Sequence, residues 1–196
     1  DPLASRPRPS YGACEFSKTD LKTGMTTLKP GVYCGGVFVS GDAVVDLEPG
    51  EYIFNGPLVV KDKATLRGDD VGLFMTGAAG VIKFMNDATI DLNGRESGAM
   101  SGLLIFDDPL QKGSMRAHIV SASNARNLTG TIYIPNANFV VEPSALVAQD
   151  SAYTAIVAKR LIVQGGPTLV LNTNYSDTSV PVPDGIKSAA AIHLVD

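Results

Sequence analysis

The sequence has little charge, few aromatic residues and no tryptophan. Charged residues make up 18% of the 196 residues, and the net charge of −4 comes without a basic cluster. Partners such as nucleic acid or an anionic membrane surface are therefore disfavoured, because both need concentrated positive charge. No apolar run approaches the ~18 residues that a membrane-spanning helix needs, so we expect no such helix in this chain.

The chain also lacks the short motifs of many enzymes and metalloproteins. It has no phosphate-binding loop, no dinucleotide-binding fingerprint and no Ser-His-Asp order. His118 and His193 lie far apart in the sequence, without a partner at zinc-ligand spacing. Asp69 and Asp70 are carboxylates of the kind that bind calcium, although an ordinary solvated turn is the favoured interpretation. We therefore expect no cofactor and no metal ion.

What the sequence does contain is a repeat. Leu28-Lys-Pro-Gly-Val-Tyr33 returns as Leu47-Glu-Pro-Gly-Glu-Tyr52, and each copy leads into a glycine, a short apolar run and a polar turn. A looser third copy ends at Ala88-Thr-Ile-Asp-Leu92. A repeat of about 20 residues made of short strands and turns is typical of a β-solenoid, in which each repeat forms one coil.

This pattern predicts an all-β chain that forms a right-handed parallel β-helix of about six coils. Residues 1–26 are Pro-rich and then polar, and we expect them to form an N-terminal arm that covers the exposed end of the first coil. Residues 27–175 form the predicted β-helix, and residues 176–196 form a C-terminal tail. Within the tail, the sequence 191–195 predicts a short strand against the last coil.

Two pairs of residues recur at equivalent places of successive repeats. We expect Tyr33 to stack on Tyr52 along the solenoid axis, and Ala43 on Ala64. A ladder of tyrosines can serve as a sugar-binding strip or as a structural stack. The structural interpretation is favoured here because the ladder has only two rungs.

Cys14 and Cys34 are the only cysteines. An even count in a Gly-rich, β-rich chain favours one disulfide in an extracytoplasmic protein over two buried thiols in a cytosolic one. The bridge would pin the irregular N-terminal arm to the first coil. Closing a loop of this size contributes about 3 kcal/mol when the effect is treated as chain entropy.

One group of residues suggests an enzyme. Asp107 and Asp108 end a predicted strand, and Arg116 and His118 follow closely. Pectinase-like enzymes place acids and bases on one exposed face of a parallel β-helix, and two carboxylates can act as acid and base if burial separates their pKa values. However, Asp before Pro109 also favours an ordinary turn. The motif set of polygalacturonases is not reproduced, so we assign no catalytic residue.

Several ordered motifs resemble those of a known family. They are Leu28–Gly36, Leu47–Ile53, Gly56–Leu58, Gly102–Asp108, Leu128–Pro135 and Ser151–Ala158. From about Cys14 onward the chain resembles the C-terminal region of TadG-like proteins. These belong to the TadE/TadG group of the tight-adherence (Flp) pilus-assembly system of Gram-negative bacteria.

The resemblance implies an exported structural domain in pilus biogenesis or surface adhesion, with no chemistry of its own. Its partners would be pilus or secretion-apparatus proteins. The full-length protein would be held in the inner membrane by an N-terminal hydrophobic helix that these residues do not include, with this domain in the periplasm or at the cell surface. The alternative is a carbohydrate-active or carbohydrate-binding β-helix protein. The family supplies no catalytic residues to transfer.

Overall fold

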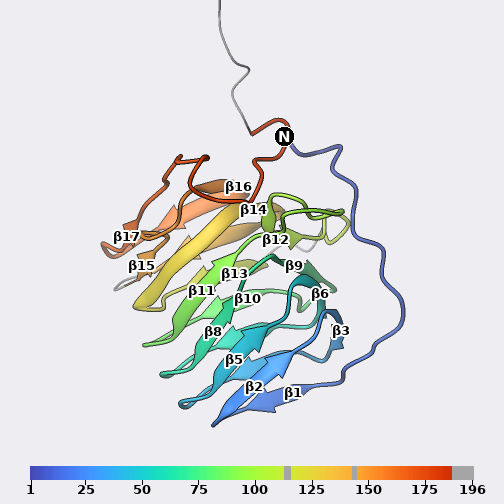
Figure 1. Ribbon diagram of the computed structural model, residues 1–196, viewed down its shortest axis with the longest axis vertical. Coiled ribbons are helices and arrows are strands. Elements are labelled where there is room, and N and C mark those ends of the chain that lie inside the picture. Colours follow the sequence, from blue (N-terminus) through green and yellow to red (C-terminus); the bar gives the residue numbers. More distant parts are fainter. Residues whose placement is uncertain (113–115, 143–144, 187–196) are drawn as a thin grey trace, which may run out of the picture.

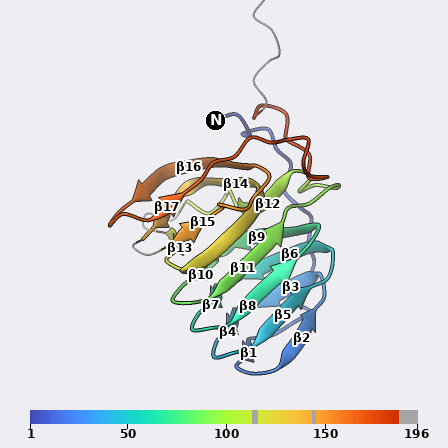
Figure 2. The same cartoon turned by 60° about the vertical axis from the view of Figure 1, so that its left-hand side comes forward.

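The computed structural model describes residues 1–112, 116–142 and 145–186. Its strands are parallel and stacked into a β-solenoid of about seven turns, and the described residues contain no helix. The predicted parallel β-helix is therefore confirmed (Figure 1). The turned view shows the coils stacked one above the next along the long axis (Figure 2).

Each full coil contributes one strand to each of three faces. The first face stacks β1 (Thr19–Leu21), β4 (Val37–Val39), β7 (Leu58–Val60), β10 (Ile82–Phe84), β13 (Ala117–Val120) and the later parts of β14 (Asn124–Val141) and β16 (Thr154–Val163). The second face stacks β2 (Met25–Leu28), β5 (Val44–Leu47), β8 (Thr65–Gly68), β11 (Thr89–Asn93), the start of β14, β15 (Leu146–Val147) and β17 (Thr168–Leu169). The third face stacks β3 (Gly31–Cys34), β6 (Gly50–Asn55), β9 (Val71–Thr76), β12 (Leu103–Asp107), the middle of β14 and the start of β16.

The interior is built from ladders of apolar side chains. One position of the first face is occupied in successive coils by Leu21, Val39, Val60, Phe84, Val120, Val141 and Val163. Ala43, Ala64 and Ala88 form a second ladder at a tight corner, where each is buried. Branched and small side chains suit this arrangement because each coil must pack closely on the next.

The repeated Pro-Gly turn has a direct structural reason. At Gly50 the backbone φ of +150° is one that other residues rarely adopt, and a Cβ there would lie 2.2 Å from Cγ of Pro30 in the coil below. Only glycine lets the two turns stack. The tyrosine that ends each motif closes its own turn. Tyr33 donates a hydrogen bond to the carbonyl of Lys29 at 2.7 Å, and the hydroxyl of Tyr52 lies 2.8 Å from the carbonyl of Glu48.

The register of the third face differs from the repeat in the sequence. Tyr33 pairs with Phe54, and Gly31 pairs with Tyr52. The tyrosine rings nevertheless stack as predicted, with centroids 6.0 Å apart and planes at 25°. Residues at the same place in the two motif copies are therefore not register partners; they lie two positions apart in the strand pairing. The longer β6 absorbs this offset, because it begins earlier in its coil than β3.

The solenoid begins earlier than predicted. β1 and β2 already pair with β4 and β5, so the first coil starts at Thr19 instead of residue 27, and there are about seven turns instead of six. The sequence 17–24 is polar because an end coil packs against a neighbour on only one side, so its strands need less apolar surface. The last pairing is the bridge between Tyr153 and Thr173.

The N-terminus and the described part of the tail, up to residue 186, lie over the upper coils in Figure 1. Val180 and Val182 of the tail pack on Tyr153, whose hydroxyl donates to the carbonyl of Pro181 at 2.7 Å. The strand predicted at 191–195 lies outside the described residues. The described residues contain no helix with the length and apolarity that crossing a membrane requires.

Candidate functional site

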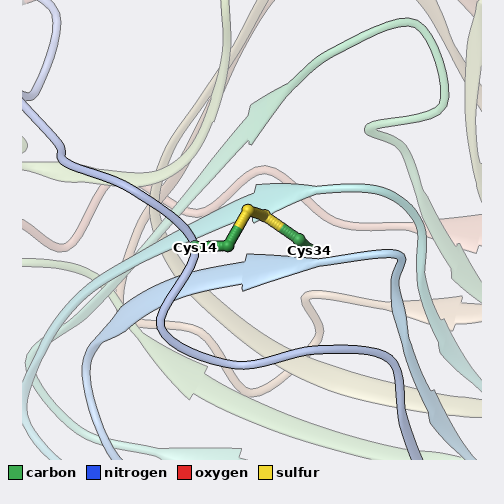
Figure 3. The surroundings of a disulfide bond; sticks show 2 residues. All are labelled: Cys14 and Cys34. Carbon is green, nitrogen blue, oxygen red and sulfur yellow. A yellow bond between two sulfur atoms is a disulfide. The ribbon is translucent and has the colours of Figure 1, made fainter.

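The predicted disulfide joins the arm to the first coil. Cys14 and Cys34 are bonded, with Cα atoms 5.8 Å apart (Figure 3). Just after the bridge, Phe16 forms a parallel bridge to Tyr33 and stacks on its ring with centroids 4.5 Å apart. Phe16 therefore covers the aromatic interior at the N-terminal end of the solenoid. A disulfide is consistent with an extracytoplasmic location.

The tyrosine ladder is not a sugar-binding strip. Tyr33 and Tyr52 are 1% and 0% exposed, so no ligand can reach their rings. Burial raises the pKa of Tyr33 to about 12 and raises the pKa of Tyr52 further, because an ionised phenolate loses its hydration there. The structural interpretation of these two tyrosines holds.

The third face carries a second apolar ladder on its outside. Val32, Ile53, Phe74, Phe106 and Tyr133 are register partners in successive coils, and we call them the outer stripe. Each is at most 5% exposed. Outward-facing side chains of a solenoid are buried only when another part of the chain covers them.

The N-terminal arm, residues 1–14, covers much of this stripe. Figure 1 shows the arm descending along the side of the stack, from the upper coils to β1. Asp1 accepts a hydrogen bond from the hydroxyl of Tyr133 at 2.8 Å, and Leu3 packs in the same cluster. Lower down, Arg8 lies over the ring of Phe74 at 5.9 Å, and Tyr11 packs against the same ring. The arm is therefore a strap along the rod as well as the predicted cover of one end.

A polar cluster lies inside the upper coils. Asp107 is a register partner of Met75 and points inward, where it is fully buried. Arg116 donates to both of its carboxylate oxygens, at 2.6 and 3.2 Å. Nδ1 of His118 accepts the backbone N–H of Ile82 at 3.3 Å, so Nε2 holds the proton and donates to Asp107 at 3.2 Å. Both carboxylate oxygens of Asp107 are therefore hydrogen-bonded inside the solenoid.

Asp108 takes part in a separate contact, beneath the arm. It is also fully buried, and its Oδ2 accepts from Thr76 at 2.8 Å and from Arg8 at 2.9 Å. The other oxygen accepts the backbone N–H of Leu110 at 3.0 Å.

The hypothesis that these residues form an exposed acid–base face is therefore wrong. Strand alternation sends Phe106 outward and Asp107 inward, and the arm covers Asp108. An acid or base must reach the proton that it transfers, and neither carboxylate reaches solvent. The sequence could not show this, because the covering residue, Arg8, is far away in the chain.

The second face carries a row of polar side chains that reach solvent. Asp46 pairs with Arg67, whose register partner is Asp91, and Asp91 accepts from Asn127 at 2.7 Å. Shallow hollows follow this row of side chains up to Asp150. The charges in this row pair with one another. Hydrogen bonds from Arg67 and Arg126 lower the pKa of Asp46 and of Asp150, respectively.

Asp69 and Asp70 lie beside this row. Asp69 accepts from Asn93 at 2.6 Å, and Asp70 binds Arg95 and the backbone N–H of Glu96. Across the described ranges, no group of three or more His, Cys, Asp or Glu residues is arranged to hold a metal ion. His193 lies outside those ranges. The two carboxylates bind side chains and backbone of the next coil, as expected of a structural turn.

Comparison of the chain with known protein families, with curated proteins and with solved structures finds no match. The function must therefore be argued from the sequence and from the surfaces just described.

Sequence reasoning missed the outer stripe, although a signal was present. Strands that alternate apolar and polar residues bury one side only, whereas continuous apolar runs indicate burial on both sides. The runs 52–54, 73–75 and 103–106 are continuous, and all lie on the third face. They indicated that something covers this face, although not that the cover is the arm.

Proposed function

We propose that this chain is an exported structural and interaction domain of a TadG-like protein in tight-adherence pilus assembly or surface adhesion. It acts by presenting a rigid rod with defined surfaces, and it catalyses no reaction. Its partners are pilus or secretion-apparatus proteins, and its place is the periplasm or the surface of a Gram-negative cell. The ordered motifs between residues 28 and 158 remain the basis for the family assignment.

One structural observation supports this proposal most. The carboxylates that offered the best catalytic hypothesis are fully buried and hydrogen-bonded by Arg116, His118, Thr76 and Arg8. Such a set specifies how the coils and the arm fit together. The disulfide and the continuous ladders add rigidity, which suits a domain that binds other proteins instead of converting a substrate.

The test is made in the native host. The 196 residues are deleted with any membrane anchor kept, and surface pili are counted by electron microscopy. We expect loss of pili or of surface attachment. A matched strain carries Arg160→Ala, an exposed residue of the last coil, and should keep its pili. Normal pili and normal attachment in the deletion strain would contradict the proposal.

The alternative, a carbohydrate-binding β-helix, rests on one observation. The second face presents an open row of carboxylate, amide and guanidinium groups along several coils, next to shallow hollows. Polar side chains of this kind can hydrogen-bond sugar hydroxyls. Saturable glycan binding that is lost in Arg67→Ala together with Asp91→Ala would support this function. Binding that survives both substitutions would exclude this face.

A further inference from the structure

We propose that the outer stripe is a docking surface for the arm of a second copy of this chain, so that two copies can exchange arms. In the exchanged pair, residues 1–14 of one chain cover the third face of the other, and Glu15 and Phe16 move with them onto its first coil. This inference goes beyond the proposed role in pilus assembly and does not depend on it, because it concerns only contacts that this chain makes with itself.

The arm has the chemistry that the stripe recognises. It is extended and contains Pro2, Pro7 and Pro9, which restrict the backbone and reduce the entropy lost on docking. Extended proline-containing segments bind well to surfaces lined by aromatic rings. Here Phe74 contacts both the Arg8 guanidinium and the Tyr11 ring, so the stripe and the arm are complementary.

Polar contacts determine the register of the arm along the rod. Arg8 reaches the buried Asp108 at 2.9 Å, and Nε of Arg6 donates to the carbonyl of Ala99 at 3.1 Å. Asp1 at the upper end accepts from Tyr133. These partners are spread over several coils, so an arm from another chain would be held in the same single position.

Most of the arm's own surface nevertheless stays exposed to solvent. Within residues 1–14 only Leu3 and Pro9 are buried. A hollow opens beside Tyr11 and Gly12, and another beside Pro2 and Pro7. Release therefore exposes little apolar surface of the arm itself. Because an arm from a second copy makes the same contacts, local concentration decides between the closed and exchanged forms.

The disulfide determines which form persists. Once Cys14 has bonded to Cys34 of its own chain, the arm cannot leave. If Cys14 bonds to Cys34 of another chain, the exchanged pair is locked covalently. The chain can cross between the two bodies at Ser17 and Lys18, which are exposed and precede β1.

The test uses two full-length variants, Cys14→Ser and Cys34→Ser, mixed in equal amounts. Each retains one thiol, so the pair Cys14–Cys34 can form only between chains. Oxidised glutathione is the oxidant: the two protein thiols give up two electrons and two protons, one disulfide forms, and one glutathione disulfide becomes two glutathione thiols. Random pairing of equal amounts would make the mixed dimers equal in amount to the two same-variant dimers combined. We expect the mixed dimers to exceed that combined amount by about threefold or more, because docking raises the effective concentration of the matched thiols.

The control tests whether docking directs the pairing. Arg8→Ala in the Cys34→Ser chain removes contacts with Phe74 and Asp108, and we expect it to lower the excess of mixed dimers toward the random proportion. Arg160→Ala in the same chain lies away from the stripe and should leave the excess unchanged. A random proportion in the parent pair, or an excess unaffected by Arg8→Ala, would overturn the proposal.

A second measurement covers the case in which either cysteine variant fails to fold. The natural chain is reduced, unfolded, and refolded with oxidised glutathione over a range of protein concentrations. Folded dimers that are linked through Cys14 and Cys34 should increase with concentration, and Arg8→Ala should reduce them. Monomers alone at every concentration would overturn the proposal. Neither experiment uses pili, so a negative result here leaves the proposed function standing.

Discussion

Val39 and Val163 lie on the same interior ladder, yet their surroundings differ. Val39 is fully buried between coils, whereas Val163 is 50% exposed in the last one. Leu161 in the same strand is 44% exposed, and in the described part of the chain this segment of β16 pairs only with β14. At the other end of the rod, Phe16 and the disulfide cover the first coil.

This difference shows that the two halves are stabilised in different ways. The lower coils have an uncharged interior with a stack of aromatic rings, short turns and a closed end. The upper coils hold the ionic cluster around Asp107, and their last coil is partly uncovered. The lower half is therefore expected to be the more stable part of the rod. The upper half is expected to unfold more easily when its packing is changed.

The largest effect is expected in the upper interior. Arg116→Met leaves the buried carboxylate of Asp107 without its cationic partner, so we expect a loss of about 4 kcal/mol in the free energy of unfolding. Urea unfolding followed by circular dichroism measures it. Combining Arg116→Met with Asp107→Leu should recover part of the loss, because no unpaired charge remains. An unchanged unfolding midpoint for Arg116→Met alone would contradict this account of the upper coils.

The next effect concerns the closed lower end. Replacing both cysteines by serine removes the bond between the arm and the first coil, and we expect the free energy of unfolding to fall by about 3 kcal/mol. Differential scanning calorimetry of the double variant, beside the natural chain with and without reductant, measures it. A double variant as stable as the oxidised natural chain would show that the lower end needs no covalent closure.

A matched pair of valines tests the comparison directly. Val60→Ala removes buried methyl groups between two coils and should cost about 2 kcal/mol. Val163→Ala, on the same ladder, should cost well under half of that, about 0.5 kcal/mol, because Val163 is already half exposed. Urea unfolding of the two variants under identical conditions gives the difference. Equal losses would mean that the upper end is covered in solution.

The repetitive lower half could be predicted from the sequence because its signals are local. The paired Pro-Gly turns, the alanines at the corners and the alternating strands each act within one coil or between neighbours. The pairing of Cys14 with Cys34 followed from simple counting. β1 was missed because an end coil is less apolar than an inner one.

The rest depends on contacts between distant residues. Whether Asp107 points into the core depends on the strand phase after the loop at 94–102, which fixes Asp107 as the register partner of Met75. The pairing of β12 with β14 is itself irregular, since the register shifts between Leu103 and Ile105. Whether Asp108 is exposed depends on Arg8. The outer stripe was visible only as continuous apolar runs, and no local pattern identifies the arm as its cover.

The smallest effect concerns the exposed ion pairs, one in each half. Hydrogen bonds from Arg67 and from Arg126 lower the pKa of Asp46 and of Asp150 below the unfolded value of about 3.9. The stabilisation from each pair is therefore complete above that value and is lost as the pH falls through the lower pKa of the folded state. Asp46→Asn and Asp150→Asn should each shift the urea midpoint at pH 7 by less than Val163→Ala does, and the shift should shrink as the pH falls below the lowered pKa. Because both pairs are solvated, the shifts should be alike in the two halves and should shrink in added salt. A larger shift for Asp150→Asn would mean that the upper coils depend on their surface charges as well as on the buried cluster.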